Sequence, residues 1–145
     1  SIGEIEMVRR GRDAGLPLSG APGSRDPREV DTAFFELLHL ADDGDAAAAK
    51  LFDEAGRSAA MAVTMISELM EIDTVIVGGP RWDPMRHLVE PSMRPVLDGH
   101  RVHGAARPVS LDSDPLGWRA GAVGAACLIL DEVFTPRSST LLINP

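Results

Sequence analysis

The stretch EIDTVIVGGPRWDPM, residues 71–85, carries the signals that decide the fold. Its run of β-branched residues predicts a buried strand over Thr74–Val77, because such side chains favour extended and packed backbone. The strand ends at Gly78 and Gly79, and Asp83, which precedes a proline, predicts the N-cap of a helix. A buried strand that ends in two glycines brings bare backbone to the protein surface, where a ligand can approach closely.

The elements around this stretch are predicted from hydrophobic periodicity and from capping residues. They are helices over residues 3–14, 27–41, 46–73 and 120–134, and a second strand at Arg107–Leu111. Asp26 and Asp45 are predicted N-caps, and Glu29 is predicted to complete a capping box with Asp26. Pro91 and Pro95 predict a bend or a break in the helix that follows the two glycines, because each lacks a backbone donor.

The helix over residues 46–73 is the longest predicted element, and its apolar spacing predicts which face is buried. The residues that recur at helical spacing are Leu51, Ala55, Ala59, Ala62, Ile66 and Leu69. Met61, Met65 and Met70 lie on the same helix, and we interpret them as core packing rather than as a binding surface.

A strand, a helix and a second strand form a βαβ unit, whose two strands are parallel and whose crossover is almost always right-handed. The C-terminal ends of the strands then lie at one edge of the sheet, where ligands of open α/β sheets bind. This edge collects the predicted residues of a nucleotide or ligand crevice: Gly78, Gly79, Trp82, Gly117 and Trp118. Two simpler interpretations stand beside this one. The glycines can form a plain tight turn, and the tryptophans can cover the sheet edge.

The composition excludes several classes of function. The 145-residue chain has a formal net charge of −8, so it lacks the basic surface that direct nucleic-acid binding requires. No apolar run approaches the roughly 20 residues that span a membrane, and the first residues lack an apolar signal-peptide core. The single Cys127 excludes an internal disulfide and predicts a cytoplasmic protein. Its position among Ala and Leu in the last helix predicts an inert, buried thiol.

The remaining polar side chains are weaker candidates for chemistry. His100 and His103 have the spacing of a metal-binding pair, but without a third ligand two solvated histidines are the better interpretation. Asp112 and Asp114 could act as an acid and a base in a cleft, although polar loop residues beside a proline explain them more simply. The sequence therefore predicts no catalytic residue and no metal site.

Four segments resemble the ROK family of repressors, open reading frames and kinases. Residues 44–80, GDAAAAKLFDEAGRSAAMAVTMISELMEIDTVIVGGP, resemble the long helix, strand and glycine turn of that family. EPSMRPVL at 90–97 is similar to the helix that follows there, and LGWRAGAVGAACLIL at 116–130 resembles the closing loop and last helix. EIEMVRRGRDAGL at 4–16 is similar to the segment after the zinc motif in the regulator branch.

The resemblance implies a fold and a domain organisation. Residues 1–145 are expected to form a single α/β domain, with a tail at 135–145. This domain resembles the C-terminal lobe of an actin-like ATPase, or sugar-kinase-like, fold, in which long helices cover a small parallel sheet. In the family, the catalytic aspartate, the phosphate-binding glycines, the zinc motif and the winged helix of the repressors all lie upstream of the matching segments.

The resemblance also implies a function. Pro80 stands where the family often has a third glycine, and Arg119 stands where an acidic residue is common, and both argue against ATP binding. We therefore expect the sugar-sensing and assembly lobe of a transcriptional regulator, without catalytic activity or a cofactor. The alternative is the nucleotide-binding lobe of a glucokinase-like sugar kinase, which would use ATP and be active only with the missing N-terminal lobe.

Two kinds of partner are expected. The crevice is expected to bind a small-molecule sugar or nucleotide weakly, because half of it is missing. The family resemblance further implies a homodimer. The interface is expected either at the unpaired edge of the first strand or on the long helix, where Ala59, Ala60, Ala62 and Val63 would form a smooth apolar surface.

Overall fold

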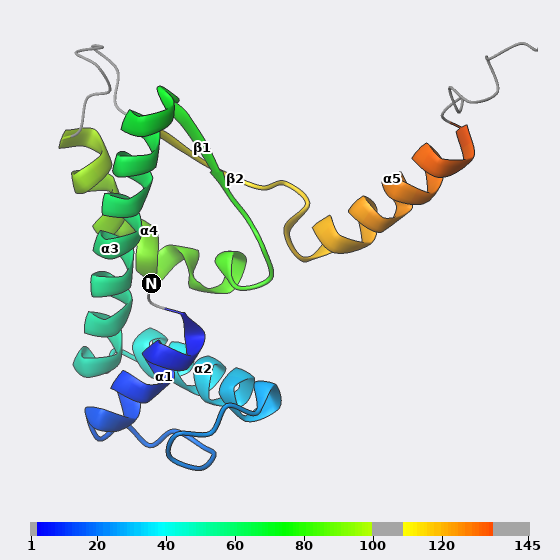
Figure 1. Ribbon diagram of the computed structural model, residues 1–145. Coiled ribbons are helices and arrows are strands. Elements are labelled where there is room, and N and C mark those ends of the chain that lie inside the picture. The colour runs from blue at the N-terminus through cyan, green and yellow to red at the C-terminus, as the bar shows by residue number, and fades with distance from the viewer. Residues whose placement is uncertain (1–2, 100–108, 135–145) are drawn as a thin grey trace, which may run out of the picture.

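The computed structural model describes residues 3–99 and 109–134 of the chain. The elements are α1 (Glu4–Asp13), α2 (Pro27–Asp42), α3 (Ala46–Met70), β1 (Thr74–Val77), α4 (Trp82–Gly99), β2 (Ser110–Ser113), the 3-10 turn η2 (Gly117–Arg119) and α5 (Ala120–Phe134). In Figure 1, α1 and α2 lie beside the lower half of α3, α4 packs along α3, and α5 extends away from this body. A small parallel sheet with long helices confirms the expected α/β architecture.

Helix α2 begins at an aspartate cap, as predicted. The Asp26 side chain accepts a hydrogen bond from the backbone N–H of Arg28 at 2.8 Å. The predicted capping box is wrong, because the N–H of Asp26 donates to Ser24 Oγ at 3.2 Å instead. Glu29 accepts a hydrogen bond from the N–H of Ala21 at 3.3 Å, so its carboxylate holds the preceding loop rather than the helix end.

Helix α3 also begins and ends for clear local reasons. Asp45 accepts hydrogen bonds from the N–H groups of Ala47 and Ala48, each at 2.9 Å, which confirms the predicted N-cap. Glu71, with φ 56° and ψ 37°, closes the helix in the left-handed conformation that commonly ends helices. The helix therefore stops three residues before the predicted position 73.

The predicted buried face of α3 is wrong in its C-terminal half. Ala59, Ala62, Ile66 and Leu69 are exposed, and so are the three methionines that we assigned to the core. Leu51 is buried as predicted, but from the middle of the helix onward the buried residues are Gly56, Ala60, Thr64 and Ser67. Small residues dominate this face because α4 lies against it. Hydrophobic spacing predicted that the row of large apolar residues would be buried. The row of small residues is buried instead, because only small side chains let α4 lie close to α3.

Gly56 of α3 lies in close contact with the backbone of α4. A Cβ atom built at Gly56 would lie 2.0 Å from Ser92 Oγ and 2.5 Å from the carbonyl oxygen of Val89. Both partners belong to α4, and the hydroxyl of Ser92 donates to the same carbonyl at 2.8 Å. The absence of a side chain at position 56 therefore sets how α4 is placed against α3.

The sheet consists of β1 and β2, which pair in parallel as predicted, with Thr74 opposite Ser110 and Val77 opposite Ser113. The bounds of β1 match the prediction, but its residues are exposed or half-buried, so the predicted burial of the strand is wrong. The second strand lies at Ser110–Ser113 rather than at Arg107–Leu111, and residues 107 and 108 lie outside the described ranges. Asp112 is consequently a strand residue and not a loop residue. The strand tolerates polar residues because only one of its faces is buried.

Helix α4 departs from the prediction at its start. It begins at Trp82, whose N–H donates to the carbonyl of Gly79 at 3.1 Å, so Asp83 lies in the first turn and is not the N-cap. Pro91 and Pro95 lie within one continuous helix rather than breaking it. Both prolines are exposed, so water can reach the backbone carbonyls that they leave without an intrahelical donor.

Aromatic rings and one arginine join the lower helices to the rest of the body. Phe34 of α2 and Phe52 of α3 are fully buried and meet edge to face, with ring centroids 6.1 Å apart. The guanidinium of Arg81, just before α4, lies over the Phe34 and Phe35 rings, 5.5 Å and 5.0 Å from their centroids. Arg81 also pairs with Glu4 of α1 at 2.9 Å, so it connects three helices.

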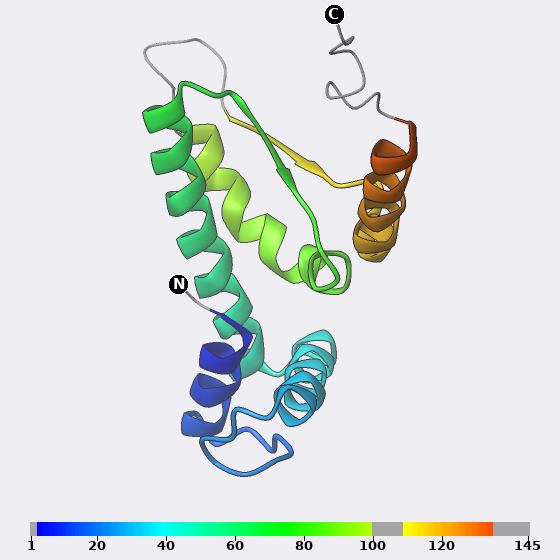
Figure 2. The same cartoon turned by 45° about the vertical axis from the view of Figure 1, so that its right-hand side comes forward.

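Helix α5 has the predicted bounds, but its environment does not match the prediction. None of its residues is buried, and both views show it standing clear of the body (Figures 1 and 2). Cys127 is exposed, so the predicted buried thiol is wrong. The face of small residues near Gly121 and Gly124 packs against nothing in the described part of the chain. An apolar sequence predicts burial, but burial also needs a partner.

Candidate functional site

A polar hollow lies where β2 ends, between η2 and the first turn of α4. Its volume is about 520 Å³. The residues that line it are Asp83, Arg86, Ser113, Asp114, Pro115, Leu116, Gly117, Trp118 and Arg119. The hollow is at the C-terminal edge of the parallel sheet, which is the edge where open α/β sheets bind their ligands.

The loop after β2 is held in place by its own aspartate. The N–H of Asp114 donates to the carbonyl of Val77 at 2.8 Å, which continues the sheet one residue beyond β2. The Asp114 side chain accepts from the N–H of Leu116 at 2.8 Å, in the pattern of an Asx turn. The Asp114 carbonyl accepts from the N–H of Gly117 at 3.3 Å. These contacts shape the floor of the hollow before any ligand arrives.

Gly117 brings this loop against α4. Its φ of 52° lies in the left-handed region, which glycine adopts without strain. A Cβ atom at this position would lie 2.5 Å from Oδ2 of Asp83. A side chain at position 117 would therefore push the loop away from the first turn of α4 and change the shape of the hollow.

The two tryptophans have different environments. Trp82 is only 4% exposed and belongs to the hydrophobic core, and its indole N–H donates to Ser113 Oγ at 2.8 Å. Trp118 is 77% exposed and lines the hollow. Trp82 thus ties the start of α4 to the end of β2, whereas Trp118 presents its ring to solvent and to any bound molecule.

The glycine pair after β1 shapes the site without lining it. A Cβ atom at Gly78 would lie 2.6 Å from the Cβ of Asp114, so the close approach at this glycine is made by the chain's own loop. Gly79 has φ 107°, which only glycine adopts readily, and no atom lies within 4 Å of where its Cβ would be. The two glycines therefore let the β1–α4 turn pass under the loop that carries Asp114.

Of the five predicted crevice residues, the structure brings Gly117 and Trp118 into the hollow. Gly78, Gly79 and Trp82 lie behind it and support its walls. Sequence reasoning missed Asp83 and Arg86 as lining residues, whereas it placed Arg119 at the edge that would face a nucleotide. The signal for the first two was available, since residues at i and i+3 in the first turn of a helix share a face, and this helix starts at the sheet edge.

The charges in the hollow suit binding of a polar ligand. The pKa of Arg86 is raised by its hydrogen bond to the Glu90 carboxylate, 2.5 Å from its Nε, so the guanidinium stays charged at the rim. Asp83 and Asp114 supply carboxylate acceptors, Arg119 a second guanidinium, and Trp118 an aromatic face. Donors, acceptors and one ring surface are what a sugar or a nucleotide needs.

Within residues 3–99 and 109–134, no cluster of three or more His, Cys, Asp or Glu side chains is arranged to hold a metal ion. The predicted histidine pair at positions 100 and 103 lies outside these ranges. No helix in the described part of the chain has the length and apolar character needed to cross a membrane.

Comparison with known proteins places the chain among its relatives. The model of the ROK family matches residues 24–132. Among solved structures, the chain is similar to a ROK family glucokinase from Streptomyces griseus, determined in complex with glucose and AMPPNP, with a TM-score of 0.58 and 26% identity. The match covers 87% of this chain and 42% of the glucokinase. No sequence of a curated protein matches the chain. The structural similarity confirms the expected sugar-kinase-like fold.

Proposed function

Because the chain belongs to the ROK family, we propose that it is the sugar-sensing and assembly lobe of a transcriptional regulator and performs no catalytic step of its own. The polar hollow at the sheet edge supports this proposal. Asp114 is held in place by the backbone of its own loop, and its remaining acceptor sites join Asp83, two guanidinium groups and the Trp118 ring as contacts for a ligand. The hollow thus offers contacts for binding more than groups for chemistry.

The proposed ligand is a sugar or a nucleotide, bound weakly. The exposed Trp118 ring gives a stacking surface, and Arg86 and Arg119 give donors around it. The hollow is open to solvent, so few contacts can enclose a ligand. We therefore expect dissociation constants in the millimolar range, about −4 kcal/mol.

Tryptophan fluorescence tests the binding proposal. Glucose and AMPPNP, titrated separately, should change the emission of the wild-type chain in a saturable way at millimolar concentrations. Trp118→Phe removes the exposed reporter and should abolish the change, while the emission of the buried Trp82 remains as an internal control for folding. Saturable binding at micromolar concentration would contradict the proposal, because it would show a complete site within this chain.

The second candidate is the nucleotide-binding lobe of a ROK sugar kinase, and the similarity to a glucokinase crystallised with glucose and AMPPNP favours it. In that case Arg86 and Arg119 would face nucleotide phosphates. The chain spans 42% of the glucokinase, so we expect activity only together with a complementary lobe. A coupled assay with glucose and ATP should show no turnover by the chain alone. ATP-dependent turnover that is lost in Gly117→Ala would refute both the regulator proposal and the kinase-lobe proposal.

The two candidates differ in what accompanies this lobe. A regulator requires a DNA-binding segment, and a kinase requires a lobe that carries the catalytic aspartate. The coding sequence that precedes the codon for Ser1 distinguishes them directly. With a net charge of −8, the chain itself should not shift operator or random DNA in a gel at moderate salt. A shift that weakens steeply with added salt would contradict the assignment of DNA binding to another segment.

A further inference from the structure

A second hollow lies between α1 and the N-terminal half of α3, and it shares no residue with the polar hollow at the sheet edge. Its volume is about 490 Å³, which is in the range of sites for small molecules. Two of its lining residues, Ala14 and Ala47, are exposed alanines whose small side chains leave room for a ligand. Leu51, which is only 7% exposed, adds an apolar wall. We call this space the α1–α3 groove.

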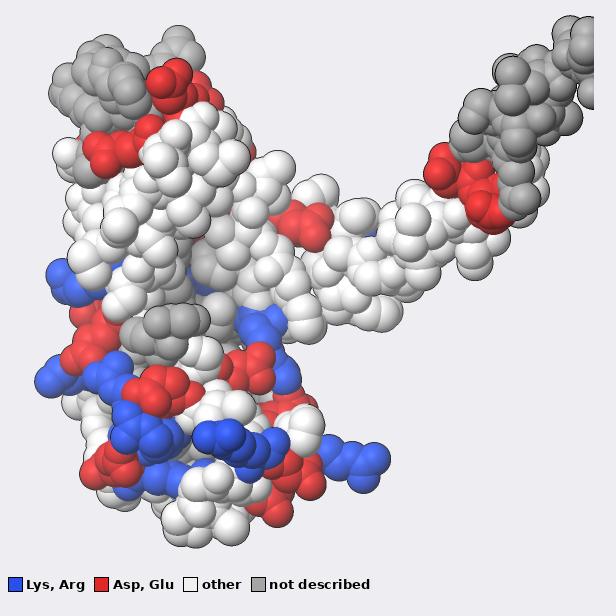
Figure 3. Space-filling model, in the orientation of Figure 1, with Lys and Arg blue, Asp and Glu red and all other residues white. Residues whose placement is uncertain are grey.

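Cationic side chains reach the α1–α3 groove from both helices. Arg9 and Arg10 belong to α1, and Lys50, the only lysine of the chain, belongs to α3. Charged side chains gather over α1 and α2, whereas the surface over the C-terminal half of α3 is largely uncharged (Figure 3). Arg9 is neutralised on its own helix, since its guanidinium pairs with Glu6 at 2.5 Å and with Asp13 at 2.6 Å. The positive charge that remains for a ligand is therefore that of Arg10 and Lys50.

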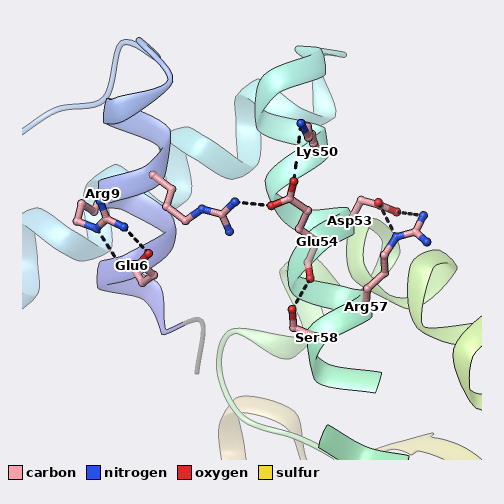
Figure 4. Close-up of polar contacts among 8 residues, drawn as sticks. Glu6, Arg9, Lys50, Asp53, Glu54, Arg57 and Ser58 are labelled. Atoms are coloured by element: carbon pink, nitrogen blue, oxygen red, sulfur yellow. Dashed lines mark hydrogen bonds and ion pairs between the residues drawn. The ribbon is translucent and has the colours of Figure 1, made fainter. Parts of the chain in front are cut away.

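Arg10 and Lys50 share a single carboxylate. Glu54 accepts a hydrogen bond from Nη2 of Arg10, and its Oε1 lies 3.8 Å from Nζ of Lys50 (Figure 4). Two positive charges thus face one negative charge, which leaves one positive charge in excess. Nε and Nη1 of Arg10 donate to no acceptor in the described part of the chain. The side chains of Arg10 and Lys50 are 32% and 74% exposed, so a dissolved anion can reach both.

We propose that the α1–α3 groove binds the phosphate group of a small phosphate monoester, which contacts Arg10 and Lys50 and displaces the carboxylate of Glu54 from between them. A phosphate dianion equals the two cations in charge, whereas one carboxylate leaves a charge uncompensated. Its oxygens also match the planar donors of an arginine. The groove is larger than a phosphate, so the organic part of the molecule can lie against Leu51. The bound phosphate joins α1 to α3.

The single lysine allows a direct test of this site. Reductive methylation with ¹³C-formaldehyde labels Lys50 as the only lysine and keeps its positive charge. Glycerol phosphate, titrated at constant ionic strength, should shift the NMR signal of the labelled lysine in a saturable way at millimolar concentrations. Inorganic phosphate should do the same, and glycerol without phosphate should not. The signal does not depend on either tryptophan, so its outcome is separate from that for the hollow at the sheet edge.

Three substitutions distinguish a phosphate site from a purely structural set of ion pairs. Arg10→Met should weaken binding by about tenfold or more, because it removes a charge-assisted hydrogen bond. Glu54→Gln should strengthen binding severalfold, because the phosphate then no longer competes with a carboxylate. Arg57→Met is the matched control. It also removes one positive charge, but Arg57 pairs with Asp53 at 2.9 Å and does not line the groove, so the affinity should stay unchanged.

Thermal unfolding gives a second measurement that needs no label. Glycerol phosphate should raise the unfolding midpoint of the wild-type chain, because a ligand stabilises the folded state that binds it. Lys50→Met should lose this increase and remain folded, since the side chain that it replaces is 74% exposed. A lysine signal that glycerol phosphate does not shift would overturn the proposal. So would equal weakening by Arg57→Met, which would indicate attraction by net charge alone, or weaker binding by Glu54→Gln, which would show that the carboxylate is not displaced.

Discussion

The crossing of α3 and α4 depends on the missing side chain at Gly56, and Gly56→Ala tests this dependence. The added methyl carbon would lie 2.0 Å from Ser92 Oγ and 2.5 Å from the Val89 carbonyl oxygen. The hydroxyl can rotate away, but the carbonyl is part of the α4 backbone and can yield only if the helices separate. Over-packing of this kind costs about 3 kcal/mol at its upper end. Alanine is about 1 kcal/mol more favourable than glycine in a helix, so the net loss in the free energy of unfolding is about 2 kcal/mol.

The loss is measurable by thermal or urea unfolding followed by circular dichroism. A destabilisation of 2 kcal/mol should lower the midpoint by about 8 °C in a chain of this size. Gly124→Ala is the control, because no atom lies within 4 Å of a Cβ there and the same propensity gain applies without a clash. Adding Ser92→Ala to Gly56→Ala should recover only part of the loss, since the carbonyl remains. A Gly56→Ala variant as stable as the wild type would refute the close crossing.

Three other predictions concern polar contacts and the hollow. Arg81→Met should lower the free energy of unfolding by about 1–2 kcal/mol, because it removes the pairing with Glu4 and the cation–π contact while keeping an apolar stem. Urea unfolding measures this loss. A loss below about 0.5 kcal/mol would contradict the role of Arg81 as a connection between helices. The pKa of Glu90 is lowered, first by its hydrogen bond to Arg86, so its contribution to stability is present above its unfolded value near pH 4.3 and is lost as the pH falls through the folded value. Glu90→Gln should therefore reduce the fall in the free energy of unfolding below about pH 4.3, by roughly 0.5–1 kcal/mol. The same fall in the variant as in the wild type would contradict this. Gly117→Ala should abolish the ligand-induced change of tryptophan emission and cost about 1–2 kcal/mol of stability, because alanine is strained at this positive φ; retained binding would show that the loop position is not required.

The elements of the fold could be predicted where one local signal decided them. Asp26 and Asp45 cap helices as expected, because an aspartate followed by a helical pattern satisfies backbone donors without tertiary help. The β-branched run gave β1 its correct bounds. The polar strand β2 was misplaced, since its extended conformation comes from pairing with β1 rather than from the propensity of Asp112 or Ser113.

The environment of each element was less predictable, because it depends on neighbours that local patterns do not specify. The methionines at 61, 65 and 70 were predicted to be core residues, but they are exposed and the small residues of α3 are buried. Cys127 was predicted to be buried, but it is exposed because no element in the described part of the chain covers α5. Both errors have the same origin, since hydrophobicity indicates that a face should be covered but not which surface covers it.

The wrongly predicted buried face of α3 and the lining residues that the sequence did not predict are connected through α4. The small residue at position 56 lets α4 lie close against α3, and this placement carries the first turn of α4 to the end of β2. There Trp82 reaches Ser113, and Asp83 meets Gly117. The same close packing turns the larger side chains of α3, centred on Met65, away from the core. One glycine thus positions the candidate ligand site and leaves the large apolar side chains of α3 exposed.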